Sequence, residues 1–172
     1  MNTKVSHLKL YLLIVGALLL ILVSSSAAAG VQVELVEPKK FSDILLSGQS
    51  KKNSIKTIQK QFNIMLADIA KEVIDETDNL KIEITNIDLA GDIEYFYGSQ
   101  NREMRVLKDP EHYRIEFKYE LKSSDGKVKF SGEAKIKEFV HHNPRKFKNY
   151  KYSHIGYMRE DVESWLKKTF AK

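Results

Sequence analysis

The chain has 172 residues, of which 28 are Lys or Arg and 23 are Asp or Glu, giving a formal net charge of +5. Dedicated nucleic-acid binders usually carry a larger or more clustered basic excess, so intracellular nucleic acid is not an expected partner. The sequence contains no Cys. This composition excludes thiol catalysis, thiolate metal sites and the lipidated Cys of a bacterial lipoprotein.

The first 29 residues have the pattern of a secretory signal peptide. Lys4 and Lys9 make a basic start, residues 10–23 contain no charged side chain, and small residues follow up to Ala29. This uncharged run of 14 residues is shorter than the roughly 17–25 that span a bilayer as a helix. We expect a periplasmic or secreted protein after cleavage near Ala29, with Ala27 as the alternative site, and no transmembrane anchor in the mature chain.

Residues 30–172 are expected to form one domain, because a chain of this length can bury a sufficient apolar core without disulfides. Alternating apolar residues over 31–36 predict a first strand that ends at Pro38. A long helix is predicted from Asn53, as its N-cap, to about Asp78. The predicted buried face of this helix consists of Ile55, Ile58, Phe62, Met65, Ile69 and Val73.

A second strand follows the helix, and a short third strand is predicted over 105–107. Along the second strand the apolar residues change from even to odd positions. A one-residue bulge near residues 85–86 would return all of them to one face of the sheet. These apolar residues are Ile82, Ile84, Ile87 and Leu89.

The clearest pair of strands flanks Asp125-Gly126, which is typical of a two-residue type I′ hairpin turn. Apolar and charged residues alternate on both sides of it, so a slip of one residue would turn every apolar side chain outward. The predicted cross-strand pairs are Leu121 with Phe130, Tyr119 with Gly132, Phe117 with Ala134, Ile115 with Ile136, Lys118 with Glu133, Glu116 with Lys135, Arg114 with Lys137 and Lys122 with Lys129.

A short closing helix is predicted after Gly156, with acidic residues near its start and basic residues near its end, as the helix dipole favours. Its apolar face contains Met158, Val162, Trp165, Leu166 and Phe170. The order of elements predicts an α+β fold in two layers, with one long and one short helix on one face of a mainly antiparallel sheet. The sheet becomes mixed if the first two strands form a right-handed parallel crossover.

Several short motifs, in the same order along the chain, resemble an uncharacterised secreted bacterial family, domain of unknown function 3016. They are Val31–Asp43, Asn86–Gly91, Arg105–Pro110, Arg114-Ile115, Ser124–Gly126, Gly132-Glu133 and Trp165-Leu166. The resemblance implies an exported protein, and it brings no established activity, ligand or catalytic residue. The family usually carries Asp where Asn86 stands here, which argues against an obligatory acid or metal ligand at that position.

Three carboxylates surround a glycine turn and form the first candidate site. Asp88, Asp92 and Glu94 lie on either side of Gly91. Such a group could hold a hard cation or act as an acid–base pair, although its spacing is not that of a calcium loop. The alternative interpretation is a solvated strand end in which Gly91 adopts a positive φ.

A second candidate site is the 145–152 loop, where basic and aromatic residues interleave. This composition suits an anionic polymer of the envelope, through charge and stacking, and the alternative is a solvated loop. Its candidate binding residues are Arg145, Lys146, Lys148, Tyr150, Lys151 and Tyr152.

Neither a cofactor nor a resident metal is predicted. His141, His142 and His154 lack a fixed metal-ligand spacing, and the common hydrolase, metalloprotease and nucleotide-binding motifs are absent. The preferred hypothesis is an exported periplasmic protein that serves as a non-enzymatic accessory or binding module of the bacterial envelope. It would present its sheet face or its 145–152 loop to an unknown envelope protein. The alternatives are a small metal-assisted enzyme using Asp88, Asp92 and Glu94, and a binder of anionic envelope polymer through the 145–152 loop.

Overall fold

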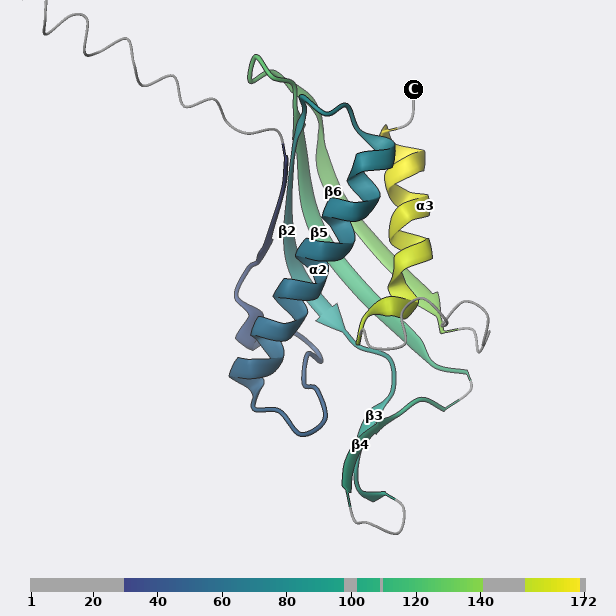
Figure 1. The fold of residues 1–172 in the computed structure, drawn as a ribbon. Coiled ribbons are helices and arrows are strands. Elements are labelled where there is room, and N and C mark those ends of the chain that lie inside the picture. The colour runs from purple at the N-terminus through teal and green to yellow at the C-terminus, as the bar shows by residue number, and fades with distance from the viewer. Residues whose placement is uncertain (1–29, 98–101, 109, 141–153, 171–172) are drawn as a thin grey trace, which may run out of the picture.

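A computed structural model describes residues 30–97, 102–108, 110–140 and 154–170. Its main sheet has four strands in the order β1-β2-β5-β6. β1 (Gly30–Leu35) is parallel to β2 (Asn79–Asp88), whereas β5 (His112–Lys122) and β6 (Val128–Phe139) continue the sheet in antiparallel fashion. The helices α2 (Lys51–Val73) and α3 (Arg159–Phe170) cover one face of this mixed sheet (Figure 1). The predicted two-layer α+β fold is confirmed.

The long helix α2 begins earlier and ends earlier than the sequence predicted. Its N-cap is Ser50, whose Oγ accepts a hydrogen bond from the Asn53 N–H at 3.3 Å. The prediction of Asn53 as N-cap is therefore wrong by three residues, because both residues are good caps. At the other end Ile74 is extended, and the chain turns toward Asp78, whose buried carboxylate accepts hydrogen bonds from Lys129 at 2.7 and 2.8 Å.

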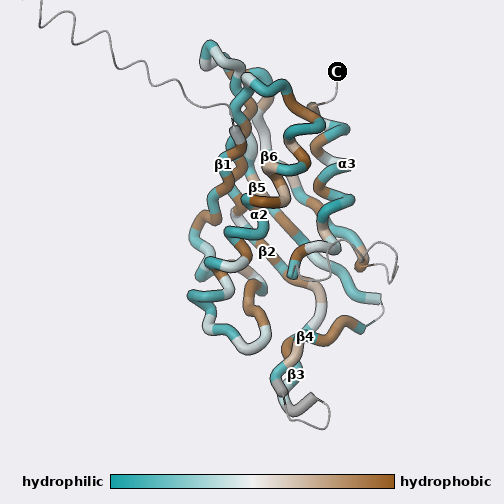
Figure 2. Tube along the Cα trace, viewed as in Figure 1, coloured by the Kyte–Doolittle hydropathy of each residue, from teal (hydrophilic) through white to brown (hydrophobic). Residues whose placement is uncertain are grey.

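The hydrophobic core lies between the two helices and the sheet. Along α2 and the strands, hydrophobic and hydrophilic residues alternate (Figure 2). The predicted face of α3 is confirmed, since Leu166 is fully buried and Trp165 packs edge-on against Phe117 at a ring distance of 4.7 Å. The core also includes Ile58, Phe62, Leu66, Ile69, Ile82, Ile84, Ile87, Ile115 and Met158.

The predicted bulge in β2 is confirmed. The pairing of β2 with β5 shifts register between Ile84 and Asn86, and Ile82, Ile84 and Ile87 are all buried. Without this extra residue Ile87 would point to the charged face of the sheet, so burial of the apolar side chain specifies the bulge.

The register of the β5–β6 hairpin is also confirmed, except next to its turn. A hydrogen bond from the Ser123 N–H to the Lys127 carbonyl, at 2.9 Å, closes a loop of three residues, Ser124–Gly126, in which Gly126 takes a φ of 83°. Lys122 therefore lies opposite Val128, and the predicted pairing of Lys122 with Lys129 is wrong. The extra residue in β6 is Lys129, whose ammonium group binds Asp78 instead.

A second, two-stranded sheet was only partly predicted. It consists of β3 (Asp92–Tyr97) and β4 (Arg102–Val106), and it stands away from the main sheet at the end opposite the β5–β6 turn (Figure 1). The 3₁₀ helices Pro38–Lys40 and Gly156–Met158 complete the described elements. Within the described ranges, we find no helix that combines the length and the hydropathy needed to cross a membrane.

Candidate functional site

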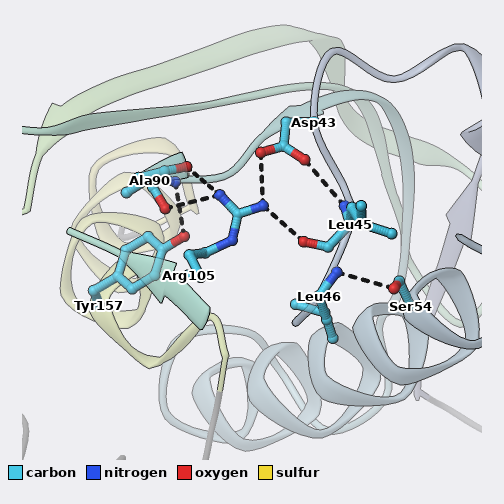
Figure 3. A network of polar contacts seen from close by, with 8 residues as sticks. Asp43, Leu45, Leu46, Ser54, Ala90, Arg105 and Tyr157 are labelled. Carbon is cyan, nitrogen blue, oxygen red and sulfur yellow. Dashed lines mark hydrogen bonds and ion pairs between the residues drawn. The ribbon is translucent and has the colours of Figure 1, made fainter. Parts of the chain in front are cut away.

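The side chain of Arg105, in β4, joins three segments at the base of the β3–β4 hairpin (Figure 3). Its NH2 group donates to an Asp43 carboxylate oxygen and to the Leu45 carbonyl, both at 2.7 Å. Its NH1 group donates to the carbonyls of Ala90, at 3.1 Å, and Gly91. The Arg105 side chain is only 14% exposed, so these charge-assisted bonds form largely out of water.

Asp43 is held in place by the backbone around it. Its N–H donates to the Ile87 carbonyl at 3.0 Å, and its own carbonyl accepts from the Leu89 N–H at 3.2 Å, as in a parallel ladder. Its second carboxylate oxygen accepts from the Leu45 N–H at 3.0 Å. These contacts orient the carboxylate independently of Arg105, which lowers the entropic cost of the ion pair.

Gly91 lets the hairpin approach the main sheet closely. Its φ is 76°, and a Cβ added there would lie 2.3 Å from the Val106 carbonyl oxygen. The predicted positive φ at this position is confirmed. Both the conformation and the lack of space require glycine at this turn.

Tyr157 supports the same turn from the other side. Its hydroxyl accepts a hydrogen bond from the Ala90 N–H at 3.1 Å (Figure 3). Burial raises the pKa of the Tyr157 hydroxyl far above its usual value near 10, so this group stays neutral at physiological pH. Arg105 and Tyr157 thus hold the Ala90-Gly91 turn by its carbonyls and its N–H, which is a positioning role.

On the outer face of the sheet, Ser42 and Asn86 tie the same loop to β2. The Ser42 N–H donates to the side-chain Oδ1 of Asn86 at 2.9 Å, and the side-chain Nδ2 of Asn86 donates to the Ser42 Oγ at 3.1 Å. An Asp at this position could accept from both the Ser42 N–H and its hydroxyl. The Ser42–Asn86 contact therefore gives position 86 a structural role, which either an amide or a carboxylate could fill.

Two members of the predicted carboxylate cluster belong to separate ion pairs. Asp88 lies 3.4 Å from the guanidinium of Arg114, while Glu94 lies 2.7 Å from the ammonium of Lys108, and their hydrogen bond raises the pKa of Lys108. Asp92 begins β3 opposite Val106. Across the described ranges no group of three or more His, Asp or Glu side chains is arranged to hold a metal ion. The metal-assisted hypothesis stays a prediction, without a gathered site to support it.

The other predicted candidates are not brought into this site. His154 is exposed, and its backbone N–H donates to the Gln61 side chain at 3.0 Å. His141 and His142 lie outside the described residues. The 145–152 loop also lies outside them, so its proposed contact with an anionic polymer stays a prediction for Arg145, Lys146, Lys148, Tyr150, Lys151 and Tyr152.

Sequence reasoning missed the three side chains that organise the hairpin base: Asp43, Arg105 and Tyr157. Asp43 and Arg105 occur in the family-like motifs, which gave a signal for them, although the motifs did not show that they meet. Tyr157 gave no signal, because a lone Tyr in an irregular segment is not distinctive.

Comparison with known proteins places the chain in a family. The model of the family described as "Protein of unknown function (DUF3016)" matches residues 29–168, and no curated protein matches the chain.

Two solved structures are similar only at a low level. One is the hypothetical protein CT253 from Chlamydia trachomatis, with a TM-score of 0.33, 10% identity, and coverage of 81% of this chain and 94% of that one. The other is a minor lipoprotein from Acinetobacter baumannii, with a TM-score of 0.30, 8% identity, and coverage of 82% and 91%. At such scores neither likeness carries an argument. The family match covers most of the sequence, and the chain therefore belongs to the DUF3016 family, whose function is unknown.

Proposed function

We propose that the protein is an exported, non-enzymatic binding module of the bacterial envelope, and that its β3–β4 hairpin contacts an envelope protein. The observation that carries this proposal is the hairpin itself. It projects from the main sheet (Figure 1) and exposes Tyr95 by 63% and Met104 by 44%. Exposed large apolar side chains on a projecting element favour an interaction surface, and both residue types are common in protein interfaces.

The contacts of Arg105 with Asp43 and the neighbouring backbone, which we call the clamp, support a binding role. A two-stranded ribbon alone is marginally stable in water, so a projecting hairpin needs to be held from its base. The Arg105 side chain contacts Asp43 and the backbone of Leu45, Ala90 and Gly91, all near that base. A rigid hairpin loses less conformational entropy when it binds, which favours affinity.

The charged face of the main sheet is a weaker candidate for the contact surface. Its side chains are paired with one another, for example Lys118 with Glu133 and Lys135 with Glu116, each at 3.2 Å. These side chains carry both signs in close alternation, which is typical of a solvated face. For this reason we assign the partner contact to the hairpin.

Export is tested first, by cell fractionation and by the intact mass of the protein purified from its native host. A mass that corresponds to a chain beginning near Gly30, in the periplasmic or secreted fraction, is expected. A full-length mass in the cytoplasmic or membrane fraction would contradict the exported location.

The hairpin contact is tested with a photo-crosslinking amino acid at Tyr95 or Met104, in cells that express the protein with its own leader. Ile64 on α2, which is 60% exposed, is the matched control position. We expect a discrete envelope-protein adduct from both hairpin positions and none from position 64. Equal adducts from all three positions, or none from the hairpin, would contradict the proposal.

A further inference from the structure

The two edges of the main sheet differ. At the β1 edge, the Gln59 side chain of α2 binds the outward-facing backbone: its amide donates to the Val33 carbonyl at 2.8 Å, and its oxygen accepts from the Leu35 N–H at 3.1 Å. The neighbouring Val36 N–H points the other way, to Ile84 in β2. Gln59 therefore occupies groups that an added strand would need, and this edge is blocked.

The β6 edge has no such cover among the described residues. β6 has 12 residues and ends the strand order, and large apolar side chains are exposed near both of its ends. Just after it, the Val140 N–H donates to the Glu111 carbonyl at 2.8 Å, so the even-numbered residues pair with β5. In an antiparallel ladder the odd-numbered residues then direct their N–H and C=O groups away from the sheet. Beyond the bulge they are Ser131, Glu133, Lys135, Lys137 and Phe139.

We propose that β6 is the interface with a second copy of this chain, and that two β6 strands pair antiparallel about a two-fold axis at Ala134. Each Glu133 then lies opposite Lys135 of the second copy, and each Ser131 opposite its Lys137. The outward-directed odd-numbered N–H and C=O groups match in this register. The result is one continuous sheet of eight strands, and this inference is independent of the proposed hairpin contact.

The charges on β6 select this register. Moving the axis by one residue places either Lys135 against Lys135 or Glu133 against Glu133, and like charges directly opposite each other are unfavourable. The axis at Ala134 instead gives two opposite-charge pairs and no like-charge pair among the odd-numbered residues. The short Ala134 side chain, which meets its own copy at the axis, leaves room for the close approach.

The absence of Cys from the chain makes a direct test possible. Residue 134 and its copy would form a non-hydrogen-bonded pair with Cα atoms about 4.5 Å apart, which is within disulfide range. Ser131 on the same strand is the matched control. In this register it lies opposite Lys137 of the second copy, so the two copies of residue 131 are six positions, or about 20 Å, apart along the strand. The variants are purified in reductant from cells that express the chain with its leader, and are then mildly reoxidised.

We expect Ala134→Cys to form a disulfide dimer and Ser131→Cys to stay monomeric on non-reducing gels. A mixture of Ser131→Cys and Lys137→Cys should give a heterodimer. Equal yields of dimer from Ala134→Cys and Ser131→Cys, or none from either, would overturn the register.

Sedimentation gives a second, independent measurement on the cysteine-free chain. Glu133→Lys is expected to weaken the dimer at least about tenfold, and Glu133→Lys combined with Lys135→Glu to restore it. Thermal melts show that each variant is folded. A native chain that remains monomeric at high micromolar concentration, or a double variant that does not recover, would overturn the proposal.

Discussion

Arg105→Ala removes the side chain that joins the β3–β4 hairpin to the main sheet. The change takes away the ion pair to Asp43 and the hydrogen bonds to the carbonyls of Leu45, Ala90 and Gly91. It leaves these acceptors in a space that water can only partly enter, since the Arg105 side chain was 14% exposed. We expect the folded state to lose stability and the hairpin to lose protection before the core does.

The magnitude follows from the number and type of contacts. A hydrogen bond to a charged group contributes about 1.5–3 kcal/mol, but four bonds from one guanidinium are not additive. Removing one partner of a largely buried ion pair costs about 3–5 kcal/mol. We therefore expect the free energy of unfolding to fall by about 3–5 kcal/mol, which is a large share of the roughly 5–15 kcal/mol of a typical domain.

Urea unfolding followed by circular dichroism measures this change, and amide hydrogen exchange of β3 and β4 locates it. Arg105→Lys should recover only part of the loss, because an ammonium group lacks the planar fork that reaches acceptors on both sides. Lys108→Ala is the matched control just after β4, since it removes the exposed pair with Glu94 of β3. If Arg105→Ala shifts the urea midpoint no further than Lys108→Ala does, the clamp does not hold the hairpin.

Three further predictions test separate parts of the fold. Gly91→Ala should destabilise the protein by about 2–4 kcal/mol, against about 1 kcal/mol for Gly126→Ala. Both positions have a positive φ, but of the two only Gly91 lacks space for a Cβ. Equal losses of stability in urea would contradict the clash. Gln59→Ala should speed hydrogen exchange of the outward β1 amide that it covers and cost about 1 kcal/mol, and unchanged exchange there would refute the proposed edge cover. Burial, together with a hydrogen bond to Asp161 in the case of Tyr113, raises the hydroxyl pKa of Tyr113 and Tyr157 above the unfolded value near 10. The full stabilisation from these two hydroxyls is therefore present below pH 10. Above pH 10 the free energy of unfolding should fall by up to about 1.4 kcal/mol per pH unit for each tyrosine. Tyr113→Phe should make this alkaline decline, measured by urea unfolding, less steep.

The parts of the fold that the sequence predicted are those in which a repeated pattern meets a buried face. The β5–β6 register was predictable because one slip would have exposed Ile115, Phe117 and Leu121 together. The bulge in β2 was predictable for the same reason, from the change of phase between Ile84 and Ile87. In both cases many side chains specify one geometry.

Errors occurred where a single polar contact determines the geometry. The two-residue turn at Asp125-Gly126 was a reasonable local prediction, but Lys129 is displaced from the ladder and binds Asp78. The helix α2 likewise stops at Val73, before the chain turns toward that same carboxylate. Nothing in the local sequence shows that residues 51 positions apart will pair.

The contacts at the base of the β3–β4 hairpin could not be predicted from the sequence for a further reason. β3 and β4 form their own two-stranded sheet, so their apolar residues do not follow the pattern of the main core. Arg105 and Asp43 are 62 residues apart, and each alone looks like an ordinary surface charge. The family-like motifs contained both residues, yet only the fold shows that they form one clamp. The clamp gives Arg105 a structural role, because its guanidinium satisfies backbone carbonyls that would otherwise be left unpaired at a tight turn.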